Sequence, residues 1–330
     1  MKRLFGRRAR LGIGALFAAL MLSTLVIPPA WPQAVLPYLG GTASFQSGTL
    51  EIRAMLTRPR VASRQGDHRG APRGKREKTR YPAFIHTHDR MTEEVAGRPV
   101  PLVRPDPGSY LDQLASDGYV VLFVARRGHW GSQGRTRTYL PKPGETPVNP
   151  AELYDDLEAE SSDLVAAVDY LHTLSFVDKE RIAVSGVGAG GVVALLAAAK
   201  DPRIRAVVSL AGGLQLPAQG KDEAKPLFDR AWTEVSKTIQ APVLILWAKN
   251  DPIDAAVGKD LEQRLQASGK RGQLVVYPDF KDNGRQMFYQ PDGFKIFTPD
   301  LIKFLHATIG APPAKDSAAE DAAPKTPAAK

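Results

Sequence analysis

Apolar residues in the centre of the chain form short uncharged runs that alternate with longer segments of helical periodicity. Runs such as VVLFV and PVLIL have the composition of strands that are covered on both faces. Between them, apolar residues recur every three or four positions, as at Leu157, Leu164, Val168 and Leu171. The pattern predicts strands at 50–58, 81–88, 118–125, 181–185, 205–211, 242–248 and 273–278, and helices at 109–117, 156–174, 191–200, 257–268 and 298–309.

Strands that alternate with helices predict an α/β fold with a doubly wound, mostly parallel sheet flanked by helices. A chain of 330 residues could form one large domain or two modest ones. The alternation runs without an internal repeat, so we predict a single domain over 35–310. The apolar content of 43% and the charged content of 24% are ordinary for a globular protein and do not change this prediction.

The first 34 residues are typical of a targeting segment. Residues 1–10 carry five basic groups and no acid, and residues 11–27 contain no charge before Pro28 and Pro29 stop the helix. This apolar run fits the core of a signal peptide or a short membrane anchor, since a spanning helix needs about 20 apolar residues. A buried N-terminal helix is the remaining alternative. We therefore expect an exported, periplasmic or otherwise extracytoplasmic protein, either cleaved or anchored by residues 11–27.

The formal net charge of +9 is concentrated in two segments, the N-terminus and residues 58–80. The second segment carries nine basic and two acidic groups, and it is predicted to be a basic loop insertion. Such a loop could contact an anionic envelope surface. It lacks interleaved aromatic residues for base stacking, so no nucleic-acid partner is expected.

Two further features of the composition restrict the chemistry and the extent of the fold. The chain has no cysteine, which excludes disulfides, thiolate catalysis, zinc-thiolate sites and a lipoprotein anchor. Residues 311–330 consist mostly of alanine, proline and charged residues, and this composition predicts a disordered tail.

A glycine-rich turn follows the predicted strand at 181–185 and opens directly into a helix. Gly186, Gly188 and Gly191 have the spacing of a dinucleotide-binding fingerprint, in which the helix N-terminus takes a phosphate. That fingerprint needs an acidic residue at the end of the next strand, and here residues 209–213 contain none. We therefore predict no nucleotide and no other cofactor.

The turn belongs to an ordered set of segments that resembles the α/β-hydrolase superfamily, in particular its dienelactone-hydrolase and prolyl-oligopeptidase-like branch. The resemblance extends over most of residues 45–310. The segments that carry it are a strand ending in His86, then GYVVLFVARRGHWGSQG at 118–134, the glycine-rich turn, PVLILWAKNDPID at 242–254 and VVYPDFKDNGRQMF at 275–288.

In that family the turn is a nucleophile elbow with the pattern Gly-x-Ser-x-Gly, which lifts a strained serine above the sheet. Here the flanking Gly186 and Gly190 are present, but Gly188 occupies the place of the serine. Glycine cannot be a nucleophile, although it adopts the elbow conformation without strain. Ser185 lacks glycines two residues away on either side, and its place on the strand directs it into packing.

The resemblance also assigns the remaining catalytic positions. Asp251 stands at the position of the acid, or it simply caps a turn in Asn-Asp-Pro. Arg285 stands at the position of the histidine, and no histidine occurs in residues 173–305. Arginine is always charged near neutral pH and cannot act as a general base. The inherited oxyanion-hole donors would be the backbone N–H groups of Thr87 and Ala189.

Histidines near the end of the strand at 81–88 suggest a different chemistry. His86 and His88 lie on one face of that strand, and Asp89 and His129 could add further metal ligands. The continuation with arginine at position 90 does not complete a His-x-His metal motif. We therefore favour histidines with a structural role and predict no metal.

Three hypotheses about function follow. The first is an exported pseudo-hydrolase that binds an unknown small-molecule or protein ligand or acts in envelope assembly. The second is an active carboxylic-ester or peptide hydrolase with a rewired nucleophile. The third is a metal-dependent enzyme that uses His86, His88 and Asp89.

Overall fold

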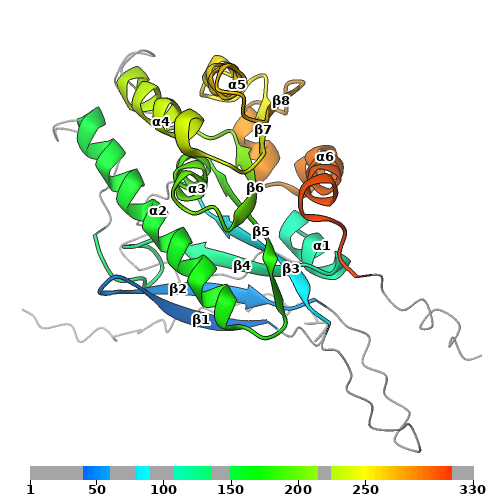
Figure 1. Cartoon of the computed structure of the whole chain (residues 1–330). Coiled ribbons are helices and arrows are strands. Elements are labelled where there is room, and N and C mark those ends of the chain that lie inside the picture. Colours follow the sequence, from blue (N-terminus) through cyan, green and yellow to red (C-terminus); the bar gives the residue numbers. More distant parts are fainter. Residues whose placement is uncertain (1–39, 60–78, 90–107, 136–148, 215–223, 314–330) are drawn as a thin grey trace, which may run out of the picture. The chain divides into compact units, whose positions relative to one another are not determined.

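A computed structural model describes residues 40–59, 79–89, 108–135, 149–214 and 224–313 (Figure 1). The described strands are β1 (Gly40–Ser47), β2 (Leu50–Thr57), β3 (Tyr81–Thr87), β4 (Val120–Ala125), β5 (Val177–Val187), β6 (Ile204–Leu210), β7 (Val243–Ala248) and β8 (Gly272–Tyr277). The described helices are α1 (Tyr110–Asp117), α2 (Pro150–Thr173), α3 (Ala189–Lys200), α4 (Lys225–Thr238), α5 (Ala256–Ala267), the 3₁₀ helix η1 (Gly284–Phe288) and α6 (Pro291–Ile309).

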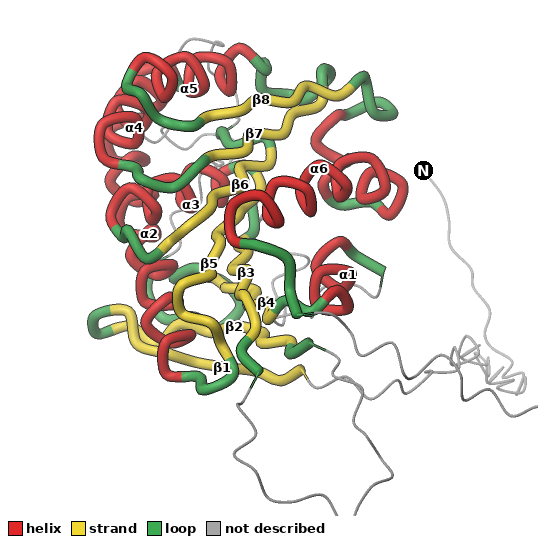
Figure 2. Tube along the Cα trace, turned by 45° about the vertical axis from the view of Figure 1, so that its right-hand side comes forward, coloured by secondary structure: helices red, strands yellow, loops and turns green. Residues whose placement is uncertain are grey.

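These strands form one sheet of eight in the order β1-β2-β4-β3-β5-β6-β7-β8. The pairs β1–β2 and β2–β4 are antiparallel, and all the others are parallel. Helices α2, α3, α4 and α5 lie on one side of the sheet, and α1 and α6 lie on the other (Figure 2). The prediction of a doubly wound, mostly parallel sheet flanked by helices, in a single domain, is confirmed.

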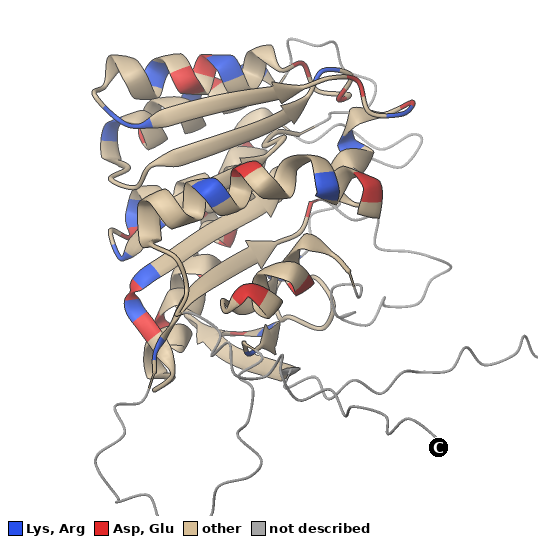
Figure 3. Cartoon of the chain, turned by 90° about the vertical axis from the view of Figure 1, so that its right-hand side faces the viewer, with Lys and Arg blue, Asp and Glu red and all other residues tan. Residues whose placement is uncertain are grey.

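The central strands β3, β6 and β7 and the carboxyl-terminal half of β5 are almost completely buried because helices cover both faces of the sheet. Charged residues lie mostly on the helices, on the loops and at the amino-terminal end of β5, whereas the other central strands are nearly free of them (Figure 3). The large buried side chains include Trp232, Trp247, Phe84 and Phe297. The core therefore holds the carboxyl ends of β3 and β5 rigidly, and these ends carry the residues that the sequence singles out.

Several elements differ from the sequence prediction. Strand β1 and helix α4 were not predicted, and α2 begins at Pro150 instead of 156 because Asn149 caps it by accepting a hydrogen bond from the Ala151 N–H. Helix α6 begins at Pro291 instead of 298. The prediction placed Pro299 in the first turn, but the helix accommodates this proline in its interior.

Several sequence predictions lie outside the described residues. These are the targeting segment at 1–34, residues 60–78 of the basic insertion and residues 314–330 of the tail. Within the described ranges, none of the helices combines the length and the apolar character needed to cross a membrane.

Candidate functional site at the elbow

The turn between β5 and α3 has the backbone geometry of a nucleophile elbow. Gly188 is the N-cap of α3, with φ 54° and ψ −121°, a conformation that side-chain-bearing residues rarely adopt. A Cβ atom on Gly186 would overlap the backbone of Gly190, and a Cβ atom on Gly190 would overlap the carbonyl of His88. The three glycines therefore let the strand, the helix and the segment after β3 approach one another closely.

The space above Gly188 is occupied by the carboxylate of Asp89. A Cβ atom built on Gly188 would overlap the carboxyl group of this residue. The Ala189 N–H donates to Asp89 Oδ1 at 2.9 Å. Ala189 is the residue whose N–H the resemblance assigns to the oxyanion hole, and it is also the first residue of α3. The carboxylate therefore lies at the positive end of the α3 dipole, where a negative charge is favourable.

Arg285 joins this carboxylate to Asp251. Its Nε and Nη2 donate to the two carboxylate oxygens of Asp251, each at 2.8 Å, in a bidentate pair. Its Nη1 donates to Asp89 Oδ2, also at 2.8 Å. Asp251 Oδ1 additionally accepts the Ile253 N–H at 2.9 Å. Asp251 thus makes the turn contact expected of Asn-Asp-Pro and also binds the residue at the histidine position. We call Asp89, Arg285 and Asp251 the elbow ion network.

The elbow ion network is largely removed from solvent. The side chain of Asp251 is 0% exposed, and those of Arg285 and Asp89 are 14% and 20% exposed. Burial opposes the charge on Arg285, but the hydrogen bonds to Asp251 and the charge of Asp89 outweigh it and raise the pKa of the guanidinium. Arg285 therefore stays a cation, and it has no lone pair with which to accept a proton.

Asp89 is also positioned through its backbone. Arg126, which is fully buried, donates to the carbonyl oxygen of His88 and forms an ion pair with Glu160 at 2.7 Å. Its Nη2 lies 3.5 Å from the carbonyl oxygen of Asp89. The segment after β3 is thus held by a buried arginine, and this segment places the Asp89 carboxylate over the elbow.

The other predicted site residues lie in the packed interior. Thr87 is the last residue of β3, is fully buried, and its hydroxyl donates to the carbonyl of Val124 at 3.0 Å. Ser185 is also fully buried, and its Oγ lies 2.7 Å from His86 Nδ1. The Tyr110 hydroxyl completes this cluster at 3.1 Å from the same nitrogen. Burial, with the charge of Arg126 as a second cause, lowers the pKa of His86 to about 3, so this ring is neutral.

The histidines near the elbow have structural hydrogen bonds. His88 Nε2 accepts the Arg126 N–H at 3.2 Å, and its Nδ1 lies 2.6 Å from the carbonyl of Asp89, so both ring nitrogens have partners. His129 Nδ1 lies 3.1 Å from the carbonyl of Arg127. In the part of the chain that the structure describes, no group of three or more histidine or acidic residues is arranged to hold a metal ion. The arrangement of His86, His88 and Asp89 therefore does not favour the metal-dependent hypothesis.

The glycine pattern is explained by packing. A Cβ atom on Gly191 would lie 2.8 Å from the Cα atom of Gly212, so this glycine allows close contact between α3 and the segment after β6. The first N–H of α3 is already bonded to Asp89. The fingerprint thus reflects the geometry of the elbow.

The fold and the elbow define an α/β hydrolase in architecture, and comparison with known proteins narrows the class. Residues 108–290, more than half of the chain, match the Dienelactone hydrolase family. The chain belongs to this family. This family assignment confirms the resemblance that the order of the sequence segments indicates.

The relatives agree with the assignment. A Methylorubrum extorquens protein named "Putative carboxymethylenebutenolidase" is 30% identical over 119 residues, which are 36% of this chain and 39% of that protein. Among solved structures, the Pyrococcus horikoshii acylaminoacyl peptidase superposes with a TM-score of 0.58 at 14% identity, over 84% of this chain and 42% of that chain. A puromycin-hydrolysing peptidase of Mycobacterium tuberculosis gives 0.58 at 18% identity, over the same shares. The chain spans well under two thirds of the length of each of these proteins.

Sequence reasoning did not place Asp89 at the elbow. It considered this residue only as a possible metal ligand, whereas the structure brings it together with Ala189, Arg285 and Asp251. A signal for this contact was available, because an arginine at the histidine position carries five N–H donors, more than Asp251 alone can accept from.

Proposed function

We propose that this chain is a non-hydrolytic member of the Dienelactone hydrolase family that acts on the extracytoplasmic side of a membrane by binding a ligand or a protein partner. The observation that carries the proposal is the elbow ion network. It fills the place where a hydrolase of this fold needs a nucleophile, an open oxyanion hole and a base.

The residues at the catalytic positions of the family do not supply a nucleophile, a base or a free oxyanion-hole donor. Gly188 has no hydroxyl, Arg285 cannot take up a proton, and the N–H of Ala189 already donates to Asp89. An oxyanion hole alone can sustain a residual rate of about 10³–10⁴ over water in an enzyme without its triad. Here one of the two donors of that hole, the Ala189 N–H, is occupied while the Asp89 carboxylate stays in place. The occupied site supports the proposed loss of hydrolysis, in addition to the missing groups.

A panel of aryl esters, a dienelactone and aminoacyl arylamides tests the proposal. We expect the purified full-length chain to turn over none of them at a rate near ~1 s⁻¹, the lower end of ordinary enzymes. Ser185→Ala and Asp89→Asn should be as inactive as the unmodified protein. The measurement is the release of the chromophore, with heat-unfolded protein as the blank.

Two results would contradict the proposal and identify the group responsible. Turnover that Ser185→Ala abolishes would assign the chemistry to the buried Ser185–His86 pair. Turnover that Asp89→Asn abolishes would make the Asp89 carboxylate the nucleophile. Either outcome would establish the hydrolase with a rewired nucleophile.

The location has its own test. Fusion of residues 1–39 to an alkaline phosphatase that is active only after export should give phosphatase activity in a bacterial host. Deletion of residues 11–27 should abolish this activity, because the uncharged run is the part that enters the membrane. An active fusion without residues 11–27, or an inactive complete fusion, would show that the segment does not export the protein.

A further inference from the structure

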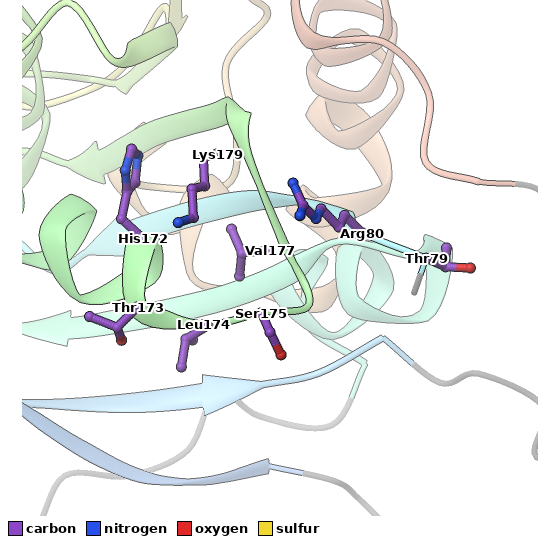
Figure 4. A pocket seen from close by; sticks show the side chains of 8 residues that line it. All are labelled: Thr79, Arg80, His172, Thr173, Leu174, Ser175, Val177 and Lys179. Carbon is purple, nitrogen blue, oxygen red and sulfur yellow. The ribbon is translucent and has the colours of Figure 1, made fainter. Parts of the chain in front are cut away.

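A hollow lies at the end of β5 opposite the elbow. Strand β5 pairs regularly with β3 from Ile182 onward, and Val177 pairs with Tyr81, so four residues of β5 lie opposite the single residue Pro82 of β3. These residues make β5 bow away from β3 in a wide arc (Figure 4). A cavity of about 750 Å³ lies between this arc, the C-terminal end of α2 and the residues before β3.

The lining of this cavity is rich in hydrogen-bond donors and basic groups. Its polar and charged residues are Arg80, Lys179, His172 and three hydroxyl residues, and no acidic residue lines it. Lys179 extends over the hollow between His172 and Val177 (Figure 4). Neither Arg80 nor Lys179 forms an ion pair with any residue that the structure describes. We call this cavity the β5 arc pocket.

The acidic residues of the arc itself are directed to other arginines. Glu180 forms an ion pair with Arg205 at 2.7 Å, and Asp178 lies 4.0 Å from Arg181. The positive charge of Lys179, which lies between these two acids in the sequence, is therefore not neutralised by its neighbours. The charge around the β5 arc pocket is complementary to an anion.

His172 also lines the β5 arc pocket, and its ring is only partly buried. Its Nε2 is buried and has no hydrogen-bond partner within the described residues. Buried polar atoms in folded proteins nearly always have one. Burial, followed by the charges of Arg203 and Lys179, lowers the pKa of this ring. A bound anion would offset those charges.

We propose that the β5 arc pocket binds a small organic anion that carries phosphate or carboxylate groups. Arg80 and Lys179 would bind the charged groups, and His172 and the hydroxyls of Thr79 and Ser175 would donate hydrogen bonds. The volume is within the range of small-molecule sites, roughly 300–1,000 Å³, and exceeds the space that one phosphate needs. The apolar side chains of Leu174 and Val177 would contact the carbon part of the ligand.

This inference does not depend on the proposed loss of hydrolysis. The β5 arc pocket lies at the amino ends of β3 and β5, and the elbow lies at their carboxyl ends. An esterase assay that overturned the proposed function would leave the pocket unaffected, and the absence of anion binding would not make the elbow catalytic.

The test uses inorganic pyrophosphate and citrate as probes on the full-length chain, by titration calorimetry at constant ionic strength. We expect at least one probe to bind with a dissociation constant below ~1 mM, and saturation to shift the ring resonances of His172. The double variant Arg80→Gln/Lys179→Gln should weaken this binding tenfold or more. Pyrophosphate binding alone would assign a phosphate ligand, and citrate binding alone would assign a carboxylate ligand.

A matched variant distinguishes binding in the β5 arc pocket from a general effect of lowering the positive charge of the protein. Lys295→Gln/Lys303→Gln removes two exposed lysines from α6 and should leave the affinity unchanged. Arg80 and Lys179 are also exposed, so all four substitutions should preserve folding, which thermal unfolding can verify. Absence of binding to both probes, or an equal loss of affinity in the two double variants, would overturn the proposal.

Discussion

Gly188→Ser combined with Arg285→His, which restores the serine and the histidine of the family, is expected to leave the protein without esterase activity while Asp89 is present. The Cβ atom of the new serine would overlap the Asp89 carboxylate. The serine would also have to adopt the strained elbow conformation, which costs roughly 1–3 kcal/mol. The carboxylate would still accept the Ala189 N–H that an oxyanion needs. Hydrolysis of p-nitrophenyl acetate measures the result.

The triple variant Asp89→Ala/Gly188→Ser/Arg285→His should gain activity because it clears the space above the elbow and frees the N–H of Ala189. We expect a rate at least about 10² above that of the double variant, well below the roughly 10⁶-fold effect of a complete, optimised triad. The control is Asp89→Ala/Gly188→Ala/Arg285→His, which lacks only the hydroxyl and should stay inactive. A double variant as active as the triple one would show that Asp89 does not obstruct the site.

The second large effect concerns stability. Arg285→Gln should lower the free energy of unfolding by about 3 kcal/mol, because breaking a buried ion pair on one side leaves an uncompensated charge and typically costs 3–5 kcal/mol. Asp251 is fully buried and would lose both charged contacts, whereas Asp89 is 20% exposed and can regain some hydration. Urea unfolding at neutral pH measures the change.

The control for this prediction removes the charges together. Asp89→Asn/Asp251→Asn/Arg285→Gln replaces the three charged groups by neutral amides and should recover much of the stability lost in Arg285→Gln. Arg285→Lys keeps the charge without the bidentate geometry, and its stability should lie between those of the unmodified protein and Arg285→Gln. If Arg285→Gln proved as stable as the unmodified protein, the elbow ion network would contribute nothing to folding.

Much of the fold could be predicted because burial on both faces leaves a direct mark on the sequence. Strands such as β4 and β7 are short uncharged runs between glycines, prolines or polar residues, and their alternation with helices implies a parallel sheet. β1 was missed because GGTASFQS is mostly small and polar, as is common for an edge strand. Helix α4 was missed because it follows a segment without clear periodicity and begins with no side-chain cap.

The candidate site could be predicted only in part. Gly188, Asp251 and Arg285 were found because each stands at a fixed place relative to a strand, and such places can be counted along the chain. The contact between Asp89 and Arg285 joins residues 196 positions apart in the sequence. No local pattern specifies it, because it depends on how the segments after β3 and β8 meet above the sheet. Charge complementarity indicates that Arg285 needs carboxylate partners. It identifies Asp89 as one of them only when the spatial neighbours of Arg285 are known.

The Asp89 carboxylate above Gly188 also bears on how the chain could change by mutation. A serine introduced alone at Gly188 meets an occupied site, and a histidine introduced alone at Arg285 leaves Asp89 and Asp251 without their shared cation. Removal of Asp89 alone takes away one acceptor and restores no chemistry. If the proposed loss of hydrolysis is correct, each single substitution toward the family pattern is expected to lower stability without a gain in activity. The three positions are therefore coupled. This coupling opposes a stepwise exchange of their residues for those of the family pattern.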